Sequence, residues 1–357
     1  MLLTTAEKQQ YNRHLILSEV GIAGQQKLKE AKVLVIGAGG LGCPILQYLA
    51  AAGVGKIGIV DDDKVDVSNL QRQILYGHSS IGINKAIAAK ERLNDINPHI
   101  EINTYAYRLT SKNAVSLFSK YDIIIDGSDN FPTRYLCNDA AVLAEKPLVF
   151  GSIYKFEGQV SVFNYQNGPT YRCLFPNPPG PNEVPNCSEV GVLGILPGII
   201  GAIQGNEVLK IVLETGEALS GKLLTYNTLN NSQIVLNFDK TEASNITELL
   251  DNYGSFCGIL ENDFQLEFST VKENLEDYIL VDVREEWERE TFHIGGIHIS
   301  LYELTNNLEL LSTNKPLLLY CETGSRSEMG RKLLLNLLPN TDIFTIIDGV
   351  NSIEKSW

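Results

Sequence analysis

Apolar residues in the first 150 positions gather into short runs of four or five, separated by longer stretches that mix apolar and polar residues. Short apolar runs without alternation are typical of strands buried on both faces, while the mixed stretches indicate helices. The pattern predicts strands over 33–37, 57–61 and 123–126, each ending in a polar residue or a glycine. Because strands alternate with helices, we predict a mostly parallel sheet with helices on both faces. Ligands bind at the carboxyl ends of such strands.

The pattern changes after residue 150, where hairpin-like strands and a proline-rich loop precede a helix predicted over 198–213. Beyond a polar stretch, a second α/β alternation has strands at 278–284 and 315–321 and a helix from Ser327. The fold class is therefore α/β, with three predicted parts: a Rossmann-like doubly wound domain over 1–245, a linker over 246–263 and a small α/β domain over 264–357.

Composition narrows the class of protein. A hydrophobic content of 44% and a charged content of 20% are those of an ordinary soluble globular chain. The net charge of −14 argues against nucleic acid or an anionic membrane as a partner, because both require a basic surface. The longest apolar run, 190–203, is too short for a bilayer and contains Pro197, so we expect it to be buried in the protein. Six scattered cysteines and no signal peptide pattern favour the reducing cytoplasm.

The first predicted strand leads into a glycine-rich turn. Gly37, Gly39 and Gly42 satisfy G-x-G-x-x-G between a strand and a helix, and Asp61 ends the next strand. Backbone amides at the start of such a helix bind phosphate oxygens, and the acid holds a ribose hydroxyl. By itself the motif favours a nicotinamide dinucleotide and an oxidoreductase. A P-loop is excluded because the chain contains no G-x-x-x-x-G-K-[ST].

Cationic residues downstream of Asp61 support a different nucleotide. Arg72 and Lys85 are the residue types that stabilise the charge on a triphosphate as pyrophosphate leaves. Asp129 offers a carboxylate for magnesium. Taken singly, Arg72 and Lys85 are better explained as solvated surface charges, which is the usual place of such residues. These residue types alone therefore leave both nucleotides open.

Five motifs in order decide between them: YNRH near the start, GAGGLG, SNLQRQ, IGINK, and SDN followed by Arg134. Together they resemble the MoeB/ThiF/HesA family, relatives of ubiquitin-activating enzymes, over about residues 5–238. The resemblance implies ATP and magnesium as cofactors. It also implies adenylation of the C-terminal glycine of a small ubiquitin-like sulfur-carrier protein of the MoaD or ThiS type.

The resemblance also assigns roles to residues of this chain. Gly40 is implied at the phosphates, Asp61 at the ribose and Asp129 at magnesium, while Arg13 of YNRH is implied to reach ATP from the other subunit of a homodimer. Arg72, Lys85 and Asp129 are the implied catalytic residues of adenylation. The whole implied ATP site comprises Arg13, Gly37, Gly39, Gly40, Gly42, Asp61, Asp63, Ser68, Asn69, Leu70, Gln71, Arg72, Lys85, Asp129 and Asn130.

The cysteines depart from the family pattern. The family usually holds a structural zinc with two C-x-x-C pairs, but Thr170 and Gly254 stand where this chain would need the first cysteine of each pair. Because Cys173 and Cys257 alone cannot complete a tetrahedral zinc site, we expect no zinc and two ordinary buried thiols. Cys187 matches the family's crossover-loop cysteine. It is either a catalytic nucleophile that forms a covalent bond with the carrier or a loop cysteine without a catalytic role.

The C-terminal region resembles a rhodanese domain through C-x-x-G-x-R-S, which comprises Cys321, Gly324, Arg326 and Ser327. Inward-facing loop amides, a helix start and an arginine all stabilise a thiolate or a persulfide anion, so we predict that Cys321 is catalytic. The resemblance further implies that Asp282 and Arg284 brace this loop. Glu322 and Glu328 flank it, which disfavours thiosulfate and suits a protein persulfide donor such as a cysteine desulfurase.

The two resemblances together predict an adenylyltransferase with a sulfurtransferase domain: carrier activation, then sulfur delivery to form a thiocarboxylate. The pathways that use such chemistry are molybdopterin, thiamine-thiazole and tRNA thiolation, and the sequence does not select among them. Two alternatives are a nicotinamide oxidoreductase and a scaffold that docks carrier proteins without turnover. The SNLQR segment opposes the first, and Arg72, Lys85, Asp129 and Cys321 together oppose the second.

Overall fold

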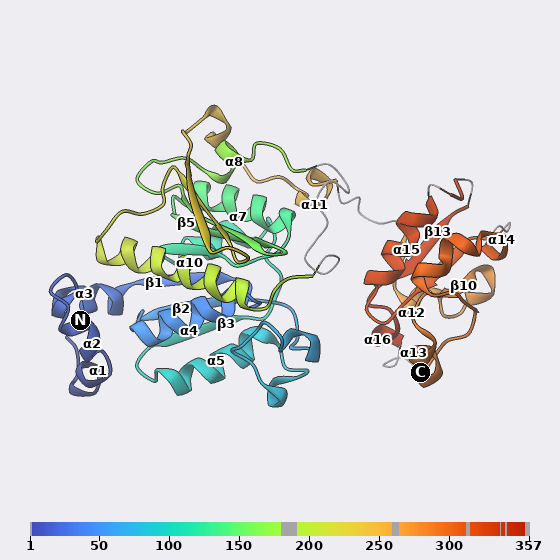
Figure 1. Ribbon diagram of the computed structural model, residues 1–357, viewed down its shortest axis with the longest axis horizontal. Coiled ribbons are helices and arrows are strands. Elements are labelled where there is room, and N and C mark those ends of the chain that lie inside the picture. Colours follow the sequence, from blue (N-terminus) through green and yellow to red (C-terminus); the bar gives the residue numbers. More distant parts are fainter. Residues whose placement is uncertain are drawn as a thin grey trace. The chain divides into compact units, whose positions relative to one another are not determined.

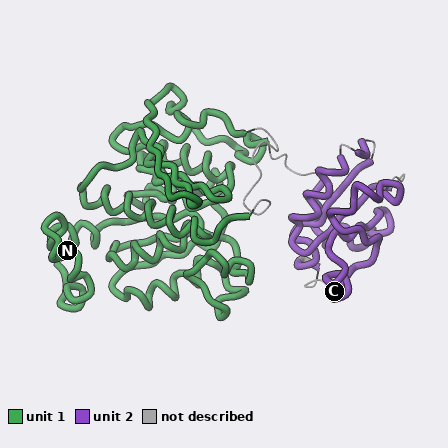
Figure 2. Tube along the Cα trace, in the orientation of Figure 1, with its two compact units in different colours: residues 1–259 green, residues 260–357 purple. Residues whose placement is uncertain are grey.

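The computed structural model describes residues 2–179, 191–258, 264–311, 315–335, 337–339 and 341–353. The chain divides into two compact units, unit 1 over Met1–Ile259 and unit 2 over Leu260–Trp357 (Figure 2). Each unit has its own sheet and its own buried apolar clusters, so each is described by itself.

Unit 1 is built on an eight-stranded sheet with the order β3-β2-β1-β4-β5-β6-β7-β8. The first five strands in chain order are parallel, and β6, β7 and β8 continue the sheet antiparallel. The strands are β1 Lys32–Ile36, β2 Lys56–Val60, β3 Glu101–Tyr105, β4 Ile123–Asp126, β5 Leu148–Tyr154, β6 Glu157–Phe163, β7 Lys222–Asn227 and β8 Ser232–Asn237. The three strands predicted from sequence are thus present to within one residue.

Helices cover both faces of this sheet, as predicted (Figure 1). One apolar cluster joins the sheet to α3, α4, α5 and α10, and the other joins it to α6, α7, α8 and α11. The helices of unit 1 are α1 Thr5–Gln10, α2 Asn12–Leu15, α3 Gly21–Glu30, α4 Gly42–Ala52, α5 Lys85–Ile96, α6 Ala114–Phe118, α7 Phe131–Leu143, α8 Tyr171–Leu174, α10 Ile195–Leu213 and α11 Tyr253–Phe256, with 3-10 turns η1 Val67–Asn69, η2 His78–Ser80 and η3 Glu242–Ser244.

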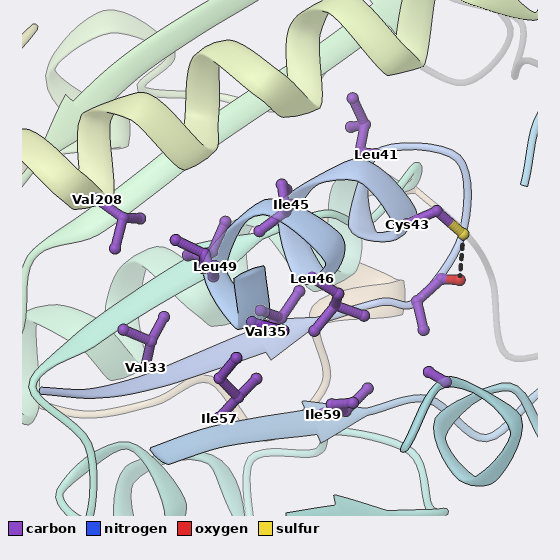
Figure 3. Close-up of a cluster of buried hydrophobic side chains, with 14 of the residues drawn as sticks. Val33, Val35, Leu41, Cys43, Ile45, Leu46, Leu49, Ile57, Ile59 and Val208 are labelled. Carbon is purple, nitrogen blue, oxygen red and sulfur yellow. Dashed lines mark hydrogen bonds between the residues drawn. The ribbon is translucent and has the colours of Figure 1, made fainter. Parts of the chain in front are cut away.

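Burial on both faces explains the uninterrupted apolar run of β1. Val33 and Val35 pack with Ile45 and Leu49 of α4 on one face, as Figure 3 shows, while Leu34 belongs to the cluster on the other face. All five side chains are completely buried. Each stabilises the fold by roughly 1.5–3 kcal/mol through the apolar surface it removes from water.

Helix α10 begins three residues earlier than predicted. It ends where Glu214 takes a left-handed backbone conformation, with φ of 55°. Among the described helices, α10 is the one long and apolar enough to pass a test for a membrane span. Its residues Leu196, Ile200 and Val208 are instead fully buried, in the cluster that α10 shares with α4 and the sheet. The expectation that the apolar segment 190–203 is buried is confirmed from Leu196 onward, whereas Leu193 and Ile195 are exposed.

Unit 2 contains a five-stranded sheet, order β11-β10-β12-β13-β9, in which every pairing is parallel. Its strands are β9 Gln265–Leu266, β10 Ile279–Asp282, β11 Ile297–His298, β12 Leu317–Tyr320 and β13 Ile343–Ile346. Its helices are α12 Phe268–Val271, α13 Glu286–Thr291, α14 Leu308–Leu311, α15 Ser325–Leu335 and α16 Val350–Ile353, with 3-10 turns η4 Leu275–Asp277 and η5 Leu301–Asn306. Helix α15 begins two residues before the predicted Ser327.

Both sheets reverse direction beside a central strand. In unit 1 the chain moves outward from β1 to β3 and then returns to β4 on the other side of β1. In unit 2 it moves from β10 to β11 and then returns to β12 on the other side of β10. Open α/β sheets bind ligands at the carboxyl ends of the strands that flank such a reversal. The predicted glycine turn and Cys321 follow β1 and β12, so both candidate sites lie at these points.

Candidate functional sites

The glycine turn between β1 and α4 depends on two of its glycines. Gly37 has a φ of +89°, and a Cβ there would lie 2.9 Å from the carbonyl oxygen of Gly127. A Cβ on Gly42 would lie 2.1 Å from the carbonyl oxygen of Gly37, a distance that no side chain tolerates. Gly39 and Gly40 are partly exposed, so the backbone between the two tight positions is open to a ligand.

Asp61 follows β2 and ties its loop to the glycine turn. One carboxylate oxygen accepts a hydrogen bond from the Ala38 amide at 2.7 Å, and the other accepts one from the Asp63 amide at 2.9 Å. A carboxylate has about four acceptor positions, so Asp61 can still receive ribose hydroxyls. Burial raises the pKa of Asp61, and the nearby Lys85 opposes that shift.

The two predicted cations come from different elements and differ in partners. Lys85 is the first residue of α5, and its ammonium donates to the Asp63 carboxylate at 2.8 Å. Arg72 follows η1, and its Cγ lies 3.8 Å from the position of a Cβ on Gly40. Its guanidinium donates to the Ser68 carbonyl at 3.1 Å. Among the described residues, no carboxylate forms an ion pair with Arg72, so its charge is available to an anion.

Several polar residues of the predicted ATP site hold its loops. Asn69 accepts from the Asp66 amide, and Asp66 accepts from the Ser68 amide, which fixes the turn before Arg72. Asn130 caps α7 by accepting from the Thr133 amide at 3.0 Å. Two further residues of the predicted site lie nearby. Leu70 is partly buried against the core, and Gln71 lies beside Gly194 at the start of α10.

Carboxylates at the same sheet edge offer two groups of metal ligands. Asp129 is exposed and follows Gly127 and Ser128, whose backbone borders Gly37. In addition, Asp61, Asp62 and Asp63 each offer an oxygen, and these oxygens lie within 4.8 Å of one another. Hard carboxylate oxygens are the donors that magnesium prefers, so the residues present fit that ion. The acidic triplet was not predicted as a metal group.

Three buried polar side chains at this edge were not among the predicted site residues, although Gln73 belongs to the SNLQRQ motif. Gln73, Asp126 and Gln204 are each at most 4% exposed, and each has one oxygen without a hydrogen bond in the described structure. Asp126 accepts from the amide and the hydroxyl of Ser128, and burial raises its pKa. Gln204 donates to the Asp126 carbonyl at 2.8 Å. Its position as a lone amide inside the apolar segment ILPGIIGAIQ was a signal that could have found it.

Arg13 lies at the opposite end of unit 1 from the glycine turn. Tyr11, two residues before it, accepts from the Asn97 side chain at 2.8 Å and lies where a Cβ on Gly53 would contact its ring. Asn97 and Gly53 follow the C-terminal ends of α5 and α4, whereas Lys85 and the glycine turn stand at the N-terminal ends. Helices of 11 and 12 residues are about 16–18 Å long. The structure therefore does not bring Arg13 to the site of its own subunit.

The cysteines of unit 1 differ in environment. Cys43 and Cys137 are fully buried, and burial raises the pKa of Cys43 to about 12. Cys257 is also buried, with a pKa raised to about 11 for the same reason. Cys173 is half-buried, and hydrogen bonds from Thr170 and Thr241 outweigh its burial and lower its pKa, so the expectation of an ordinary buried thiol is wrong for it. Cys187 lies outside the described residues.

A polar cluster occupies the region in which the family pattern would place its cysteine pairs. Arg172 of α8 makes two hydrogen bonds of 2.7 Å to Asp139 of α7, and the Tyr253 hydroxyl donates to the same carboxylate at 2.7 Å. The Arg172 guanidinium lies 5.0 Å from the Tyr135 ring centre and 4.8 Å from that of Phe256. The cluster ties α7, α8 and α11 together.

In unit 2, Cys321 follows β12 and begins a tight loop that ends at α15. The cysteine is fully buried, and its sulfur lies 3.7 Å from the Ser327 hydroxyl, which donates to the Gly324 carbonyl. Gly324 has a φ of +87°. The amide of Val350 donates to the Cys321 carbonyl at 2.8 Å, so the start of α16 holds the loop from outside.

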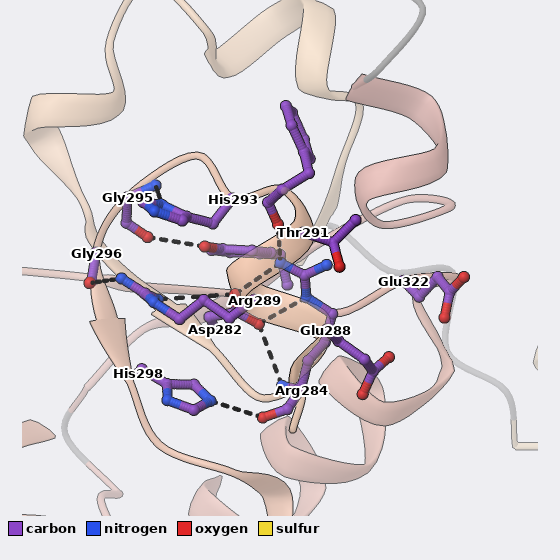
Figure 4. A network of polar contacts seen from close by, with 12 residues as sticks. Asp282, Arg284, Glu288, Arg289, Thr291, His293, Gly295, Gly296, His298 and Glu322 are labelled. Atoms are coloured by element: carbon purple, nitrogen blue, oxygen red, sulfur yellow. Dashed lines mark hydrogen bonds and ion pairs between the residues drawn. The ribbon is translucent and has the colours of Figure 1, made fainter. Parts of the chain in front are cut away.

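Asp282 and Arg284 form the predicted pair beneath this loop. Arg284 makes two hydrogen bonds to Asp282, at 2.9 and 2.8 Å, and one to the Phe292 carbonyl at 2.6 Å. Its guanidinium also lies 5.7 Å from the Tyr320 ring centre, directly before Cys321. Figure 4 shows this network, in which Arg289 approaches Asp282 at 3.7 Å.

Arg326 has a carboxylate partner that was not predicted. Both of its terminal nitrogens donate to the two oxygens of Glu288 in α13, one of them at 2.6 Å, and Glu322 lies 4.0 Å away. The hydrogen bond with Arg326 lowers the pKa of Glu288 to about 2. The segment REEWERE contains four glutamates, and nothing in the sequence marks the one that folds against the cysteine loop.

Comparison with known proteins agrees with the two resemblances. Residues 11–247 match the ThiF family, and residues 267–356 match the rhodanese-like domain. A probable adenylyltransferase/sulfurtransferase MoeZ of Mycobacterium tuberculosis is 46% identical over 91% of this chain and 87% of its own. A sulfur carrier protein adenylyltransferase of Thermus thermophilus is 49% identical over 72% of this chain and 100% of its own.

Solved structures support the fold of unit 1. A crystal structure of E. coli MccB with ATP aligns with a TM-score of 0.59 at 20% identity, covering 68% of this chain and 75% of that chain. A second MccB structure, with MccA-N7isoASN, aligns with a TM-score of 0.60 at 21% identity, with coverages of 68% and 75%. At this level of identity the likeness concerns the fold alone.

Proposed function

The chain belongs to the ThiF family and carries a C-terminal rhodanese-like domain, and from that premise we propose that it activates and sulfurates a small ubiquitin-like sulfur-carrier protein. Its relatives are adenylyltransferases and sulfurtransferases, which is the enzyme class predicted from the motifs. The proposed reaction adenylates the carrier's C-terminal glycine with ATP and then replaces AMP with sulfur to form a thiocarboxylate.

The observation that carries the proposal is the unpaired charge of Arg72 beside the open glycine turn. A triphosphate needs cations that are not already neutralised, and Arg72 borders Gly40 without a carboxylate partner among the described residues. Lys85 gives a second cation from the start of α5. A carboxylate oxygen of the carrier attacks the α-phosphorus, pyrophosphate leaves, and these cations stabilise the charge that moves to the leaving group.

Magnesium is proposed at the same edge, with Asp129 as the predicted ligand and the acidic triplet as a further source of oxygens. The ion would supply charge stabilisation on the phosphates. The Asp61 carboxylate accepts a hydrogen bond from the Ala38 amide of the glycine turn. We propose that the same carboxylate also binds the ribose hydroxyls.

A homodimer completes the proposed site. Arg13 is exposed and lies beyond the far ends of α4 and α5, so it can meet a triphosphate only in another subunit. Closed two-fold dimers place the same surface of each subunit against its copy, which allows each Arg13 to serve the partner's site.

The sulfur step is proposed at Cys321. Its thiolate attacks the outer sulfur of a persulfide on a donor protein such as a cysteine desulfurase, and the donor thiolate leaves. The resulting persulfide then attacks the acyl-adenylate and displaces AMP, which leaves the carrier bonded to Cys321 through an acyl disulfide. A second thiol, acting as the reductant, attacks the Cys321 sulfur, the sulfur–sulfur bond breaks, and the carrier thiocarboxylate leaves. Cys187, outside the described residues, is proposed either as the thiol that takes the carrier covalently or as a loop cysteine without that role. The cytoplasm is the proposed location, and molybdopterin, thiamine and thiolated tRNA are the proposed destinations of the sulfur.

Intact mass spectrometry of candidate carrier proteins tests this function. With the enzyme, ATP and magnesium, the expected product is a carrier bearing one adenylate. Addition of a persulfide donor and a thiol reductant should exchange one oxygen of the terminal carboxylate for sulfur. A carrier without its terminal glycine is the control and should remain unchanged. Absence of adenylate on every carrier of the MoaD and ThiS type would contradict the proposal.

A further inference from the structure

The cysteine loop of unit 2 differs from an ordinary anion site in its charge balance. Three arginines lie in the network beside the loop: Arg284, Arg289 and Arg326. Arg284 and Arg289 share the single carboxylate of Asp282, and one nitrogen of Arg289 is buried without a hydrogen bond in the described structure. Arg326, the cation of the loop itself, is paired with the carboxylate of Glu288.

Arg326 is the arginine inside the loop itself, and its neutralisation is specific. Glu288 faces it with both oxygens, is 8% exposed, and is held in place because it also accepts from the Glu285 amide at 3.0 Å. The bidentate pair joins α13, which comes before the loop in the chain, to α15, which contains Arg326 and follows Cys321. Paired in this geometry, the guanidinium stays charged, but Glu288 balances that charge and occupies the two donor nitrogens that would otherwise bind an oxyanion.

Two further carboxylates lie near the loop, at its rim, and one of them, Glu328, is paired with Arg331. The Glu322 side chain is 55% exposed and approaches Arg326 only to 4.0 Å, after Arg326 is already satisfied by Glu288. Glu328, in the first turn of α15, keeps one buried oxygen without a hydrogen bond in the part of unit 2 that the structure describes. A dianion such as thiosulfate therefore finds the loop cation already paired and an exposed carboxylate beside it.

We propose that Glu288 is a specificity-determining residue, which cancels the charge of Arg326 so that the loop rejects free thiosulfate and takes sulfur from a protein-bound persulfide. This inference rests on the proposed sulfur transfer at Cys321. A persulfide on a protein carries at most one negative charge, and the surface around it can carry basic residues that match the acidic rim. Backbone amides of the loop, rather than Arg326, then stabilise the persulfide on Cys321.

The two donors differ in the bond that breaks. With thiosulfate, the Cys321 thiolate attacks the outer sulfur, the sulfur–sulfur bond of thiosulfate breaks, and sulfite leaves with the electron pair. With a protein persulfide, the same thiolate attacks the outer sulfur and the donor cysteine leaves as a thiolate. Both reactions give one persulfide on Cys321 without any external oxidant or reductant, so charge recognition alone separates them.

The experiment compares the two donors on the full chain. Thiosulfate use is followed as thiocyanate formed with cyanide, and protein persulfide use as the gain of one sulfur on Cys321 from a cysteine desulfurase preloaded with cysteine. Glu288→Gln keeps the shape of the side chain and frees the Arg326 charge. It should raise kcat/KM for thiosulfate on the order of tenfold and change the rate from the protein donor by less than about threefold.

Two further variants identify the cause. Glu290→Gln removes the same charge from an exposed position of the same helix and should leave both rates unchanged. Glu288→Gln combined with Arg326→Gln removes both partners, so the thiosulfate gain should disappear. A gain that persists in the double variant would overturn the inference, and so would a Glu288→Gln protein whose donor preference equals that of the wild type.

Ionic strength gives a readout that needs no variant. Salt screens exposed charges, so raising sodium chloride should increase kcat/KM for thiosulfate in the wild type if the rim repels it. A decrease would show an attractive site and would overturn the inference even if Glu288→Gln failed to fold. Failure of the proposed function looks different, since Cys321 of the wild type would then gain no sulfur from either donor.

Discussion

The glycine turn of unit 1 and the cysteine loop of unit 2 are built alike and charged differently. Each follows a central parallel strand at the reversal point of its sheet and leads into a helix. In the glycine turn, a Cβ on Gly42 would collide with the Gly37 carbonyl, and a Cβ on Gly349, before α16, would collide with the carbonyl of Cys321. At the glycine turn, however, Arg72 has no carboxylate partner among the described residues, while at the cysteine loop Glu288 holds Arg326 with both oxygens.

The difference shows how one architecture serves two kinds of ligand. A nucleoside triphosphate arrives with several negative charges, so its site needs an unpaired cation together with backbone amides. A persulfide is a single anion formed on the protein itself, and amides suffice for it. Pairing the loop arginine then removes affinity for small free anions that would compete.

The largest expected effect separates the two sites completely. Cys321→Ala should abolish sulfur transfer from a persulfide donor and leave carrier-dependent ATP–pyrophosphate exchange nearly unchanged. Arg72→Ala should reduce exchange by about 10²–10³-fold, because it removes a cation from the transition state, while Cys321 still gains sulfur. Isotope exchange and intact mass measure the two activities. If a folded Cys321→Ala protein also lost ATP–pyrophosphate exchange, the two sites would not be independent, and the comparison would be wrong.

Subunit sharing should distinguish the sites next. Arg13→Ala and Lys85→Ala should each be inactive in exchange, yet mixing the two subunits should recover about a quarter of wild-type activity, since half the dimers are mixed and each has one intact site. Sulfur loading of Cys321 should be normal in all of these proteins, because its loop is complete within one chain. Mixed dimers without any recovery would contradict a site shared between subunits.

Gly42 and Gly349, the two glycines that lie against carbonyl oxygens, should have matching effects on the two sites. Gly42→Ala forces a Cβ against the Gly37 carbonyl, and Gly349→Ala forces one against the Cys321 carbonyl, both at 2.1 Å. We expect Gly42→Ala to impair exchange alone and Gly349→Ala to impair sulfur loading alone, with a loss of about 1–3 kcal/mol in the stability of the affected unit. Gly205→Ala, where a Cβ meets nothing within 4 Å, is the control and should change neither activity.

The scaffolds of the two units should also respond separately. Asp139→Asn breaks the buried pair with Arg172 and should destabilise unit 1 by about 3–5 kcal/mol, because a buried arginine loses its partner charge. Calorimetry should show that the thermal unfolding transition of unit 1 moves to a lower temperature, while the transition of unit 2 is unchanged. Chelation with EDTA should shift neither transition, since we predict no structural zinc. A stoichiometric zinc in metal analysis would contradict that prediction.

Acidification should give the smallest effect. The pKa of Asp61 is raised by burial, so as pH falls this carboxylate gains a proton earlier than an ordinary aspartate and loses acceptor strength for the ribose. ATP binding measured by calorimetry should weaken about two- to threefold between pH 7.5 and 5, and Asp61→Asn should remove this dependence.

The Glu288–Arg326 pair, in contrast, should not respond to pH between 7.5 and 5. The pKa of Glu288 is lowered to about 2, so the stabilisation from the pair is complete above the ordinary glutamate value and is lost only as pH falls through about 2. The preference for protein persulfide over thiosulfate should therefore be constant from pH 7.5 to 5. A preference that changes in this range would show that another titrating group controls it.

The sequence by itself determined the strands, the family and most of the chemistry. Runs such as VLVI, residues 33–36, are apolar throughout because both faces of a parallel strand are buried, and this pattern is visible without a structure. Glycines that precede a helix and a cysteine in C-x-x-G-x-R-S are local signals, since neighbouring residues form the site. Arg72, Lys85 and Cys321 could be named for the same reason.

Tertiary structure alone decided which charges are free. Glu288 is 38 positions from Arg326, and Asp139 is 33 positions from Arg172, so no local pattern relates the partners. The same holds for Arg13, whose distance from the glycine turn depends on the packing of Tyr11 against the ends of α4 and α5. Charge interactions act through space at a few ångströms, whereas sequence patterns report only spacing along the chain. The sequence therefore locates both sites, and the fold decides which anion each one accepts.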